Sequence, residues 1–418
     1  MENFSKLSEE MVVRILSRLP PKSLIRFRCV RKLWYNVINS PNFVAKNLTT
    51  SKHNKFSSST CILAKHTVLK DSNIKDRNEI LEVLRDNSIE TKKILLSLCN
   101  LCNDNDGDDP NLNYVVDDFT VPLPLGLLPF SLEIAGHCDG IICLNNSFLD
   151  DIVLCNPATK ESKLLPKSCL LLPPRHPNDY DEIESDVNAV GFGYDSKAQE
   201  YKVVRIVSFI TGVHKPLPSK AEVYTIGTNS WREIKDQTES HVFWAASFKL
   251  FLKGFYFWWA SICPPEQEII LSFDMNEELF HDIYIPESVR HDIVRCNRGL
   301  AVWKESIALL AYGGDSGAQS FDIWVIDDFG VFKSSWIKYL TIGPLEGISI
   351  PLIFWKSNEF LMAATDGRLV SYNLSTQMFK YLPIHGVEDP PYIQAVVYVN
   401  SIVSVHASNK LEGINNSS

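Results

Sequence analysis

The sequence predicts a small all-α module at the amino end followed by a large all-β domain. In residues 7–38 apolar side chains recur at three- and four-residue steps, which is the spacing of amphipathic helices. Beyond about residue 130 a different pattern repeats: an apolar strand, a turn rich in Asn, Asp, Ser, Thr and Gly, and a strand that begins at Trp, Phe or Leu. The 418 residues, 45% of them hydrophobic, leave room for two or three domains with a sizeable core.

A first helix is expected over residues 7–19. Ser8 can cap its first turn, and Glu9 and Glu10 stand at the positive end of the helix dipole. The pair Pro20–Pro21 ends this helix. Its apolar stripe consists of Met11, Val12, Ile15, Leu16 and Leu19.

A second helix is expected from Pro21, an acceptable first helical residue, to the break at Asn39–Pro41. Its apolar positions are Leu24, Phe27, Val30, Trp34, Val37 and Ile38. Two or three short helices bury too little apolar surface to be stable alone. The module must therefore dock onto its own domain or offer an apolar face to another protein.

Residues 4–48 resemble the F-box. The positions that carry the resemblance are Leu7, Ile15, Leu16, Leu19, Pro20, Leu24, Val30, Lys32, Trp34, Ile38, Ser40, Pro41 and Phe43. The family's usual Leu-Pro opening is Leu7–Ser8 here, a departure that leaves the detail of the first contact open. The resemblance implies docking onto the Skp-type adaptor of a cullin-RING ubiquitin ligase, with the rest of the chain selecting the client. An ordinary helical cap on the large domain is the alternative.

For the adaptor contact the F-box resemblance favours a set of mostly apolar residues, some of which must instead pack the module internally. This set is Leu7, Ile15, Leu16, Leu19, Pro20, Leu24 and Trp34.

Charge is unevenly distributed along the chain. Residues 1–50 carry nine Lys or Arg and three Glu, a balance of +6, which leaves −15 for residues 51–418 because the whole chain carries −9. An acidic main domain argues against nucleic acid as a partner. It favours a basic protein, chiefly through steering and selectivity.

Composition also predicts the compartment. No apolar run approaches the roughly 18 residues that span a bilayer, and charged residues occupy the amino end where a signal peptide needs an apolar stretch. The ten cysteines, which show no regular pairing, fit a reducing environment. The expected location is the cytoplasm, with the nucleus as a second option.

The segment after the module is predicted to be a polar linker over residues 49–59. A strand is expected over 60–69, and residues 75–102 fit either helix or strand, with strand favoured for Lys93–Leu98. Residues 103–110 are expected to form a solvated acidic loop. The β domain is then expected to extend to residue 405, and residues 406–418 form a carboxyl-terminal tail.

The repeating hairpins predict a kelch-like β-propeller of about six blades. They span residues 152–165, 221–234, 270–283, 323–336 and 369–382. The aromatic residues that begin the second strands of the last four are Trp231, Phe280, Trp336 and Phe379, separated by 49, 56 and 43 residues. That is the period of a four-stranded blade. An array of β-sandwiches is the alternative architecture.

Strand pairs near the propeller axis are expected between these hairpins, at residues 140–144, 250–259 and 354–362, with glycine where chains crowd. A closed ring has no exposed sheet edges. Residues 395–405 are therefore expected to share a blade with strands from residues 60–121.

The β region resembles the F-box-associated domain of plant F-box proteins. The motifs are Leu154–Glu161, Gly191–Asp195, Glu200–Arg205, Val223–Tyr224, Ser230–Trp231 and Leu252–Trp258. Further motifs are similar to the S-locus F-box and S-locus F-box-like proteins of rosaceous plants: Pro20–Leu24, Phe43–Lys46, Ser58–Leu63, Trp336, Leu340–Leu345 and Ser401–Val405. This resemblance implies expression in pollen and a stylar ribonuclease as the client, although not all of the S-locus F-box-like members determine self-incompatibility.

Motifs for catalysis or metal binding are weak. Gly191 and Gly193 are followed by Ser196 where a dinucleotide loop needs a third glycine, so a turn is expected there. Cys99 and Cys102 lack a second ligand pair at zinc spacing. We therefore expect a non-catalytic receptor without cofactor or metal. An enzyme using arginines among Arg205, Arg295, Arg298 and Arg368, or a non-degradative propeller scaffold, remains the alternative.

Recognition of a client is expected on loops at one propeller face. The acidic stretch 179–186 supplies the candidate client-binding carboxylates Asp179, Asp181, Glu182, Glu184 and Asp186. A solvated loop with no partner is the alternative for this stretch. Trp244, Trp258 and Trp259 fit either an interface anchor or the blade core.

Overall fold

The computed structural model describes most of the chain. The described residues are 8–53, 61–69, 92–102, 113–119, 132–146, 151–168, 170, 183–211, 216–235, 240–242, 249–262, 267–287, 289–290, 296–313, 318–326, 335–385 and 393–406.

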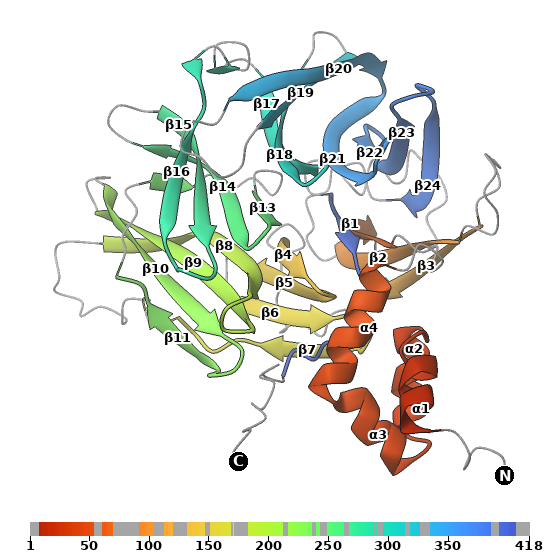
Figure 1. Cartoon of the computed structure of the whole chain (residues 1–418). Helices are drawn as coiled ribbons and strands as arrows, with labels where there is room; N and C mark the ends of the chain where they lie inside the picture. The colour runs from red at the N-terminus through yellow and green to blue at the C-terminus, as the bar shows by residue number, and fades with distance from the viewer. Residues whose placement is uncertain are drawn as a thin grey trace.

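The described strands form six antiparallel sheets set around one axis, a β-propeller (Figure 1). Blade 1 consists of β4 (Leu132–Cys138), β5 (Ile141–Asn146), β6 (Asp151–Asn156) and β7 (Glu161–Leu164). Blade 2 consists of β8 (Ile183–Asp195), β9 (Glu200–Thr211), β10 (Pro216–Thr225) and β11 (Ser230–Glu233). In blade 3 two short strands, β12 (Ser240–Val242) and β13 (Lys249–Leu252), share the first position by pairing with β14 (Phe255–Ile262), and β15 (Gln267–Asp274) and β16 (Phe280–Tyr284) are its third and fourth strands.

The remaining three blades complete the ring. Blade 4 consists of β17 (Asn297–Trp303), β18 (Ser306–Gly313), β19 (Ala318–Ile326) and β20 (Trp336–Glu346). Blade 5 consists of β21 (Ile348–Lys356), β22 (Glu359–Ala364), β23 (Arg368–Asn373) and β24 (Phe379–His385). The closing blade joins β25 (Gln394–Tyr398) to β1 (Cys61–Leu69), β2 (Lys92–Cys102) and β3 (Asn113–Phe119).

The closing blade confirms how the ring was expected to shut. Cys61 pairs with Tyr398 and Lys65 with Gln394, so the last strand of the chain joins the first. The six-bladed propeller is therefore confirmed, and nothing supports the β-sandwich alternative. The strand predicted over 395–405 is too long, because β25 ends at Tyr398 and residues 401–405 leave the sheet. The expected strand over 93–98 is confirmed as part of β2.

The five predicted hairpins are the third and fourth strands of blades 1 to 5. In three of them aromatic rings lie opposite one another across the two strands. Tyr224 faces Trp231 with 5.4 Å between ring centroids, Phe273 faces Phe280 at 4.9 Å, and Tyr372 faces Phe379 at 5.2 Å. Such cross-strand aromatic pairs fix the register of an outer strand. This is why the aromatic spacing marks the blades.

Three segments were predicted to lie near the axis. They contain the turns, and parts of the adjoining strands, where the first strand of a blade connects to the second: residues 140–144 in blade 1, 250–259 in blade 3 and 354–362 in blade 5. Gly140 shows why glycine is needed there. Its φ is +87°, and a Cβ atom would lie 2.3 Å from the Ser401 hydroxyl and 2.8 Å from the Val399 carbonyl oxygen. The crowding comes from the carboxyl-terminal segment that crosses this turn.

The helical module contains α1 (Glu9–Leu16), α2 (Pro21–Arg28), α3 (Lys32–Asn39) and α4 (Pro41–His53). The Ser8 hydroxyl accepts a hydrogen bond from the Met11 amide, as the capping argument predicts. The predicted extent of this helix to residue 19 was wrong, because α1 ends at Leu16 and Ser17 is its C-cap. The prediction of a single second helix was wrong. The helix is interrupted between α2 and α3, where the backbone of Arg31 is extended with φ −155° and ψ 139°. Neither Gly nor Pro stands at this break, so the sequence carries no local signal for it.

The predicted linker over residues 49–59 was also wrong in its first half, because α4 continues to His53. The helix is extended because Val44 and Leu48 pack against the propeller. Residues 54–59, the segment 75–91, the predicted acidic loop 103–110 and residues 407–418 lie outside the described part of the chain. None of the described helices is long and apolar enough to cross a bilayer.

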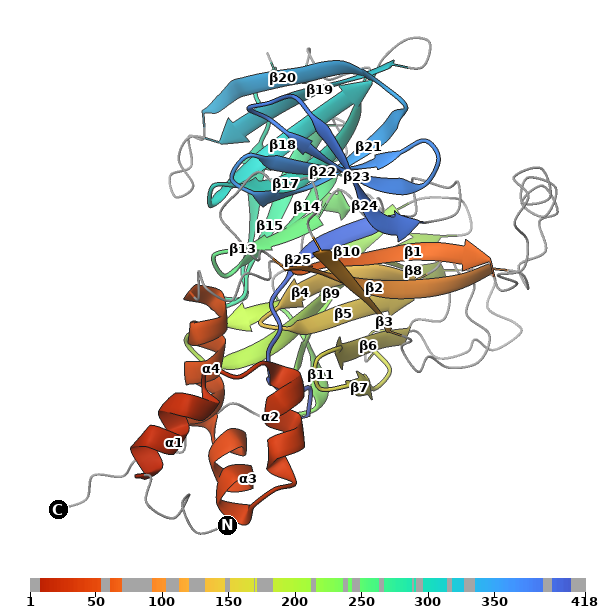
Figure 2. The same cartoon turned by 90° about the vertical axis from the view of Figure 1, so that its right-hand side faces the viewer.

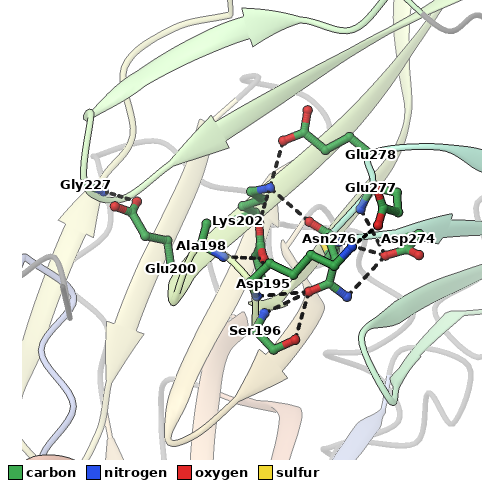
Figure 3. A network of polar contacts seen from close by, with 12 residues as sticks. Asp195, Ser196, Ala198, Glu200, Lys202, Gly227, Asp274, Asn276, Glu277 and Glu278 are labelled. Carbon is green, nitrogen blue, oxygen red and sulfur yellow. Dashed lines mark hydrogen bonds and ion pairs between the residues drawn. The ribbon is translucent and has the colours of Figure 1, made fainter. Parts of the chain in front are cut away.

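Polar side chains join blade 2 to blade 3, as Figure 3 shows. Lys202 of β9 is buried, and its ammonium group lies 2.5 Å from Asp195, 2.8 Å from Glu278 and 2.9 Å from the Met275 carbonyl oxygen. Arg232 adds two hydrogen bonds to Glu278 at 2.6 and 2.8 Å. These contacts link the β8–β9 turn to the β15–β16 turn and fix the angle between the blades.

Candidate functional site

The helical module exposes more apolar surface than its size requires. Five large apolar side chains are between 41% and 62% exposed: Met11, Ile15, Val30, Leu33 and Tyr35. Met11 and Ile15 are four residues apart on α1 and therefore share one face. A concentration of exposed apolar side chains on so small a unit is typical of a surface that binds another protein.

The structure divides the predicted adaptor-binding residues into two groups. Ile15 and Pro20 are exposed, and Leu19 and Trp34 are half-buried. Leu16 and Leu24 are 3% and 0% exposed, so they form the core of the module and cannot reach a partner. Leu7 lies outside the described residues.

Sequence reasoning missed Met11, Val30, Leu33 and Tyr35 as surface candidates. The apolar stripe of α1 could have indicated Met11 as a surface residue, because the stripe covers more of the helix than packing inside the module can bury. The module surface is also basic, in agreement with its net charge: Arg14, Arg18, Arg26, Arg31 and Lys32 are all exposed. The exposed surface thus combines apolar and cationic groups.

Residues 401–405, here called the bridge, lie between the module and the propeller. Ile402 is 2% exposed and belongs to the core of the module with Leu24 and Ile38. Val403 and Val405 are 1% and 0% exposed and belong to the core shared by blades 1 and 2. One short segment therefore completes two hydrophobic cores.

Hydrogen bonds hold the bridge against blade 1. The side-chain amide of Asn156 donates to the carbonyl oxygens of Ser401 at 3.1 Å and Val403 at 2.7 Å. The backbone amide of Val405 donates to Glu161 at 3.1 Å. These bonds satisfy polar groups of a segment that no longer has a strand partner.

Ion pairs add two direct links between the module and the propeller. Lys52 of α4 lies 2.5 Å from Asp139 in the β4–β5 turn, and Lys22 of α2 lies 2.9 Å from Asp117 of β3. The second pair is solvent-exposed and contributes little to stability. Together with the bridge, these contacts give the module one defined position on the ring.

The module lies beside the end of the propeller where the first and second strands of each blade connect (Figure 2). We call this the module end; it includes the turns at Asp139–Gly140 and Lys304–Glu305. The opposite, distal end contains the residues that begin the first strands, such as Ile183, Lys249 and Gln394. The distal end is thus the one remote from the module.

The predicted client-binding stretch is only partly described. Asp179, Asp181 and Glu182 lie outside the described residues. Glu184 and Asp186 belong to β8, opposite Ile210 and Ser208 of β9, so the prediction of a loop is wrong for residues 183–186. The hairpin is longer than its hydrophobic pattern suggested, because polar residues continue the backbone pairing at the distal end.

Trp258 and Trp259 are each 1% exposed, so both are blade core, while Trp244 lies outside the described part. Gly191 and Gly193 lie within β8, and the expected turn was wrong. At Gly191 and Gly193 the rings of Trp258 and Phe251 lie within 2.7 and 2.4 Å of where a Cβ atom would stand. These glycines allow aromatic packing between blades 2 and 3.

Within the described residues no three His, Cys, Asp or Glu side chains gather in a way that could hold a metal ion. The arginines considered for catalysis belong to different blades and have carboxylates close by. Arg205 lies 3.8 Å from Glu222, Arg298 lies 3.0 Å from Glu268, and Arg368 lies 2.6 Å from Asp366. Arg295 is outside the described residues. Among the described residues these arginines are not brought together.

A cavity of about 1210 Å³ runs along the propeller axis. Its walls come mainly from the first strands β4, β13, β17, β21 and β25. Aromatic rings of Trp303, Phe354 and Trp355 lie towards the module end, and polar side chains are found towards both ends.

Comparison with known families agrees with this two-part architecture. Residues 4–46 match the F-box domain, and residues 91–405 match the F-box associated beta propeller domain. The F-box protein CPR1 of Arabidopsis thaliana is 25% identical over 94% of this chain and 88% of its own length. An F-box/kelch-repeat protein of the same plant is 24% identical over 94% of each chain.

Solved structures resemble the chain only weakly. A nidogen/laminin complex structure is 9% identical, covers 80% of this chain and 97% of that chain, and has a TM-score of 0.36. A luciferin-regenerating enzyme is 12% identical, covers 62% of this chain and 78% of that chain, and has a TM-score of 0.34. At these TM-scores the likeness decides nothing about function.

Proposed function

Because the chain belongs to the plant F-box proteins that carry an F-box associated β-propeller domain, we propose that it is the substrate-receptor subunit of a Skp-cullin-F-box ubiquitin ligase. In this role the helical module binds the Skp-type adaptor, and the propeller holds a protein client. In this proposal the chain is a non-catalytic receptor, and ubiquitin transfer belongs to its partners.

The observation that carries this proposal is the exposed apolar surface of the module. Ile15 is 50% exposed, and Val30 is 62% exposed, although the module is otherwise packed onto the propeller by the bridge. Burial of such side chains against an adaptor would remove apolar area from water, which is the main driving force of association. The exposed arginines and lysines around them suit an acidic partner surface.

The adaptor interaction can be tested with the full chain and a purified Skp-type adaptor. Ile15→Asp places a charge in the apolar surface and is expected to weaken binding by about tenfold or more, as for the loss of one central contact. Met378→Asp is the matched control, because Met378 is 67% exposed on the propeller. Equal binding by wild type and Ile15→Asp would contradict the proposed surface, provided that Ile15→Asp and Met378→Asp have the same circular dichroism spectrum as the wild type.

For the client we propose a basic protein bound at the distal end, and among basic proteins a stylar ribonuclease of a self-incompatibility system. The support is the −15 balance of residues 51–418, the acidic stretch that leads into β8, and the sequence resemblance to S-locus F-box proteins. The alternative is a client unrelated to self-incompatibility. Opposite charges across an interface act mainly on the association rate and on selectivity.

The client proposal is tested by measuring the binding of a basic stylar ribonuclease and of a basic protein of similar charge and different fold. Tight binding of the ribonuclease alone supports it, and equal binding of both proteins contradicts it. Glu184→Lys together with Asp186→Lys should slow association, and added salt should do the same. Glu277→Lys is the control, because Glu277 lies at the module end and is exposed.

The place of action proposed for this receptor is the cytoplasm of pollen, with the nucleus as a second site. A non-degradative scaffold is separated from a ligase receptor by reconstituting ubiquitination of the bound client with adaptor, cullin and RING subunits. Client modification that depends on the module supports the ligase role. Client binding without modification favours the scaffold.

A further inference from the structure

The axial cavity differs in charge from the protein around it. Five of its lining residues carry charge at neutral pH: Lys65, Lys249, Lys304 and Lys356 are basic, and Glu133 is acidic. The balance over the whole cavity is therefore +3, whereas the whole chain carries −9. Lys304 and Lys356 are exposed at the module end, so the distal part carries +1 from Lys65, Lys249 and Glu133. A positive cavity in an acidic protein concentrates small anions, because low-dielectric walls focus the field.

Lys65 is the most unusual of these groups. It is 2% exposed, and its ammonium group donates one hydrogen bond, at 2.6 Å, to the carbonyl oxygen of Leu132. Among the described residues no carboxylate lies within ion-pair distance of it, since Glu133 pairs with Lys249 at 2.6 Å. Burial lowers the pKa of Lys65 to about 8, with Glu133 opposing and Lys249 adding to the shift. A buried ammonium group with unused hydrogen-bond donors destabilises the folded state. Its presence here therefore points to a role in binding and not in stability.

Some of the other polar lining residues also lie towards the distal end, whereas His137, Lys304, Lys356 and Ser357 lie towards the module end. Asn297 and Ser349 lie at or next to the start of β17 and β21, and Gln394 begins β25 beside Lys65. Gln319 also lines the cavity there, and its buried side-chain oxygen has no partner among the described residues. Further along the axis the walls become apolar, with Ile134, Leu250 and Leu300.

We propose that the distal part of this cavity binds a small organic anion, with Lys65 holding its acidic group and the apolar walls holding its body. Gln319 lines the cavity on another blade, and its unpartnered side-chain oxygen can accept a hydrogen bond from a hydroxyl or amide group on the body of the ligand. A carboxylate, sulfonate or phosphate meets the same charge requirement at Lys65. The volume of about 1210 Å³ admits a ligand of one to a few rings. This site is separate from the adaptor surface and does not depend on the ligase role.

The experiment compares two fluorescent probes that share one ring system. The anionic probe is 8-anilinonaphthalene-1-sulfonate, and the uncharged control is N-phenyl-1-naphthylamine. The folded full chain is expected to bind the anionic probe saturably, with one site per chain. Lys65→Met should weaken that binding by about tenfold or more, the loss of one charge-assisted hydrogen bond, and should leave the uncharged probe unaffected.

Three further variants locate the site. Lys65→Arg keeps the charge and should retain the anionic probe. Ser349→Trp fills the distal cavity while leaving Lys65 in place, so both probes should be lost even if Lys65→Met does not fold. Lys220→Met removes an exposed lysine of blade 2 and should change nothing.

The proposal is overturned by any of three results. These are no saturable binding of the anionic probe, binding that survives in both Lys65→Met and Ser349→Trp, or equal weakening of the charged and the uncharged probe in Lys65→Met. Thermal unfolding of each variant verifies that the protein titrated is folded.

Discussion

Asn156 and Val403 are 247 positions apart in the chain, yet the side-chain amide of Asn156 donates a hydrogen bond of 2.7 Å to the carbonyl oxygen of Val403. The same amide also donates to Ser401 at 3.1 Å, and Asn156 is fully buried. This contact joins the third strand of blade 1 to the bridge. The position of the helical module on the propeller depends on it.

Asn156→Ala should destabilise the protein by about 2 to 4 kcal/mol, because it leaves two buried carbonyl oxygens without donors. Urea unfolding measures the loss, and hydrogen exchange at residues 401–405 should become faster. Asn373→Ala is the matched control: Asn373 accepts turn hydrogen bonds from the amides of Ser375 and Thr376, as Asn156 does from those of Ala158 and Thr159, but it lies in blade 5. Faster exchange in the bridge of Asn373→Ala would show that the effect is not specific to Asn156.

Ile402→Ala should loosen the module, because it removes part of a core that the module cannot complete by itself. The expected cost is about 2 to 4 kcal/mol, typical of a buried Ile truncated to Ala. Hydrogen exchange should rise in α2 and α3 more than in the blades. In Ile393→Ala, a truncation in the propeller core at 4% exposure, exchange should rise in the blades instead. The same exchange pattern in both variants would argue against a separate role for the bridge.

Leu24→Ala and Ile15→Ala should separate packing from partner binding. Leu24 is fully buried, so its truncation should cost about 2 to 5 kcal/mol. Ile15 is half exposed, so its truncation should change the free energy of unfolding by less than about 0.5 kcal/mol. Thermal unfolding of the two variants tests this. A large loss of stability in Ile15→Ala would mean that Ile15 packs inside the module.

Lys65→Met should stabilise the protein at pH 7 by about 1 to 3 kcal/mol, because the folded state no longer has to hold a buried ammonium group. Burial lowers the pKa of Lys65 to about 8 from an ordinary value of 10.5. The unfolded chain therefore binds more protons between these two values, and stability contributed by this group rises with pH across that window. Urea unfolding between pH 7 and 10 should show the rise in wild type and in Lys220→Met but not in Lys65→Met.

Glu278→Gln should reduce the loss of stability in acid. Burial by itself raises the pKa of Glu278, but hydrogen bonds from Arg232 and Lys202 outweigh it, so the pKa is lowered overall. A carboxyl group with a lowered pKa stabilises the fold above its unfolded value, and that contribution disappears as pH falls through the folded value. Melting temperatures from pH 7 down to pH 3 should therefore fall less steeply in Glu278→Gln. The neighbouring Glu277→Gln, at an exposed ion pair, should follow wild type.

The sequence by itself determined the blades and the presence of the module. Aromatic residues such as Trp231 and Phe379 mark the outer hairpins because each pairs with a ring on the adjacent strand, a contact within about ten residues of chain. The helix cap at Ser8 is equally local. Periodicity and turn chemistry report such contacts directly, and the spacing of whole motifs indicates the family.

Only the tertiary structure decided which residues of the module are core and which are surface, because Leu24 and Ile15 are both apolar and both lie at helical spacing. It alone showed the break before α3, where no Gly or Pro stands in the sequence. It also showed the extension of α4 and the role of Ile402, which depend on contacts with segments far away in the sequence. The cavity around Lys65 arises in the same way. Strands from five blades surround the axis, and no local pattern in any one strand records what the others contribute.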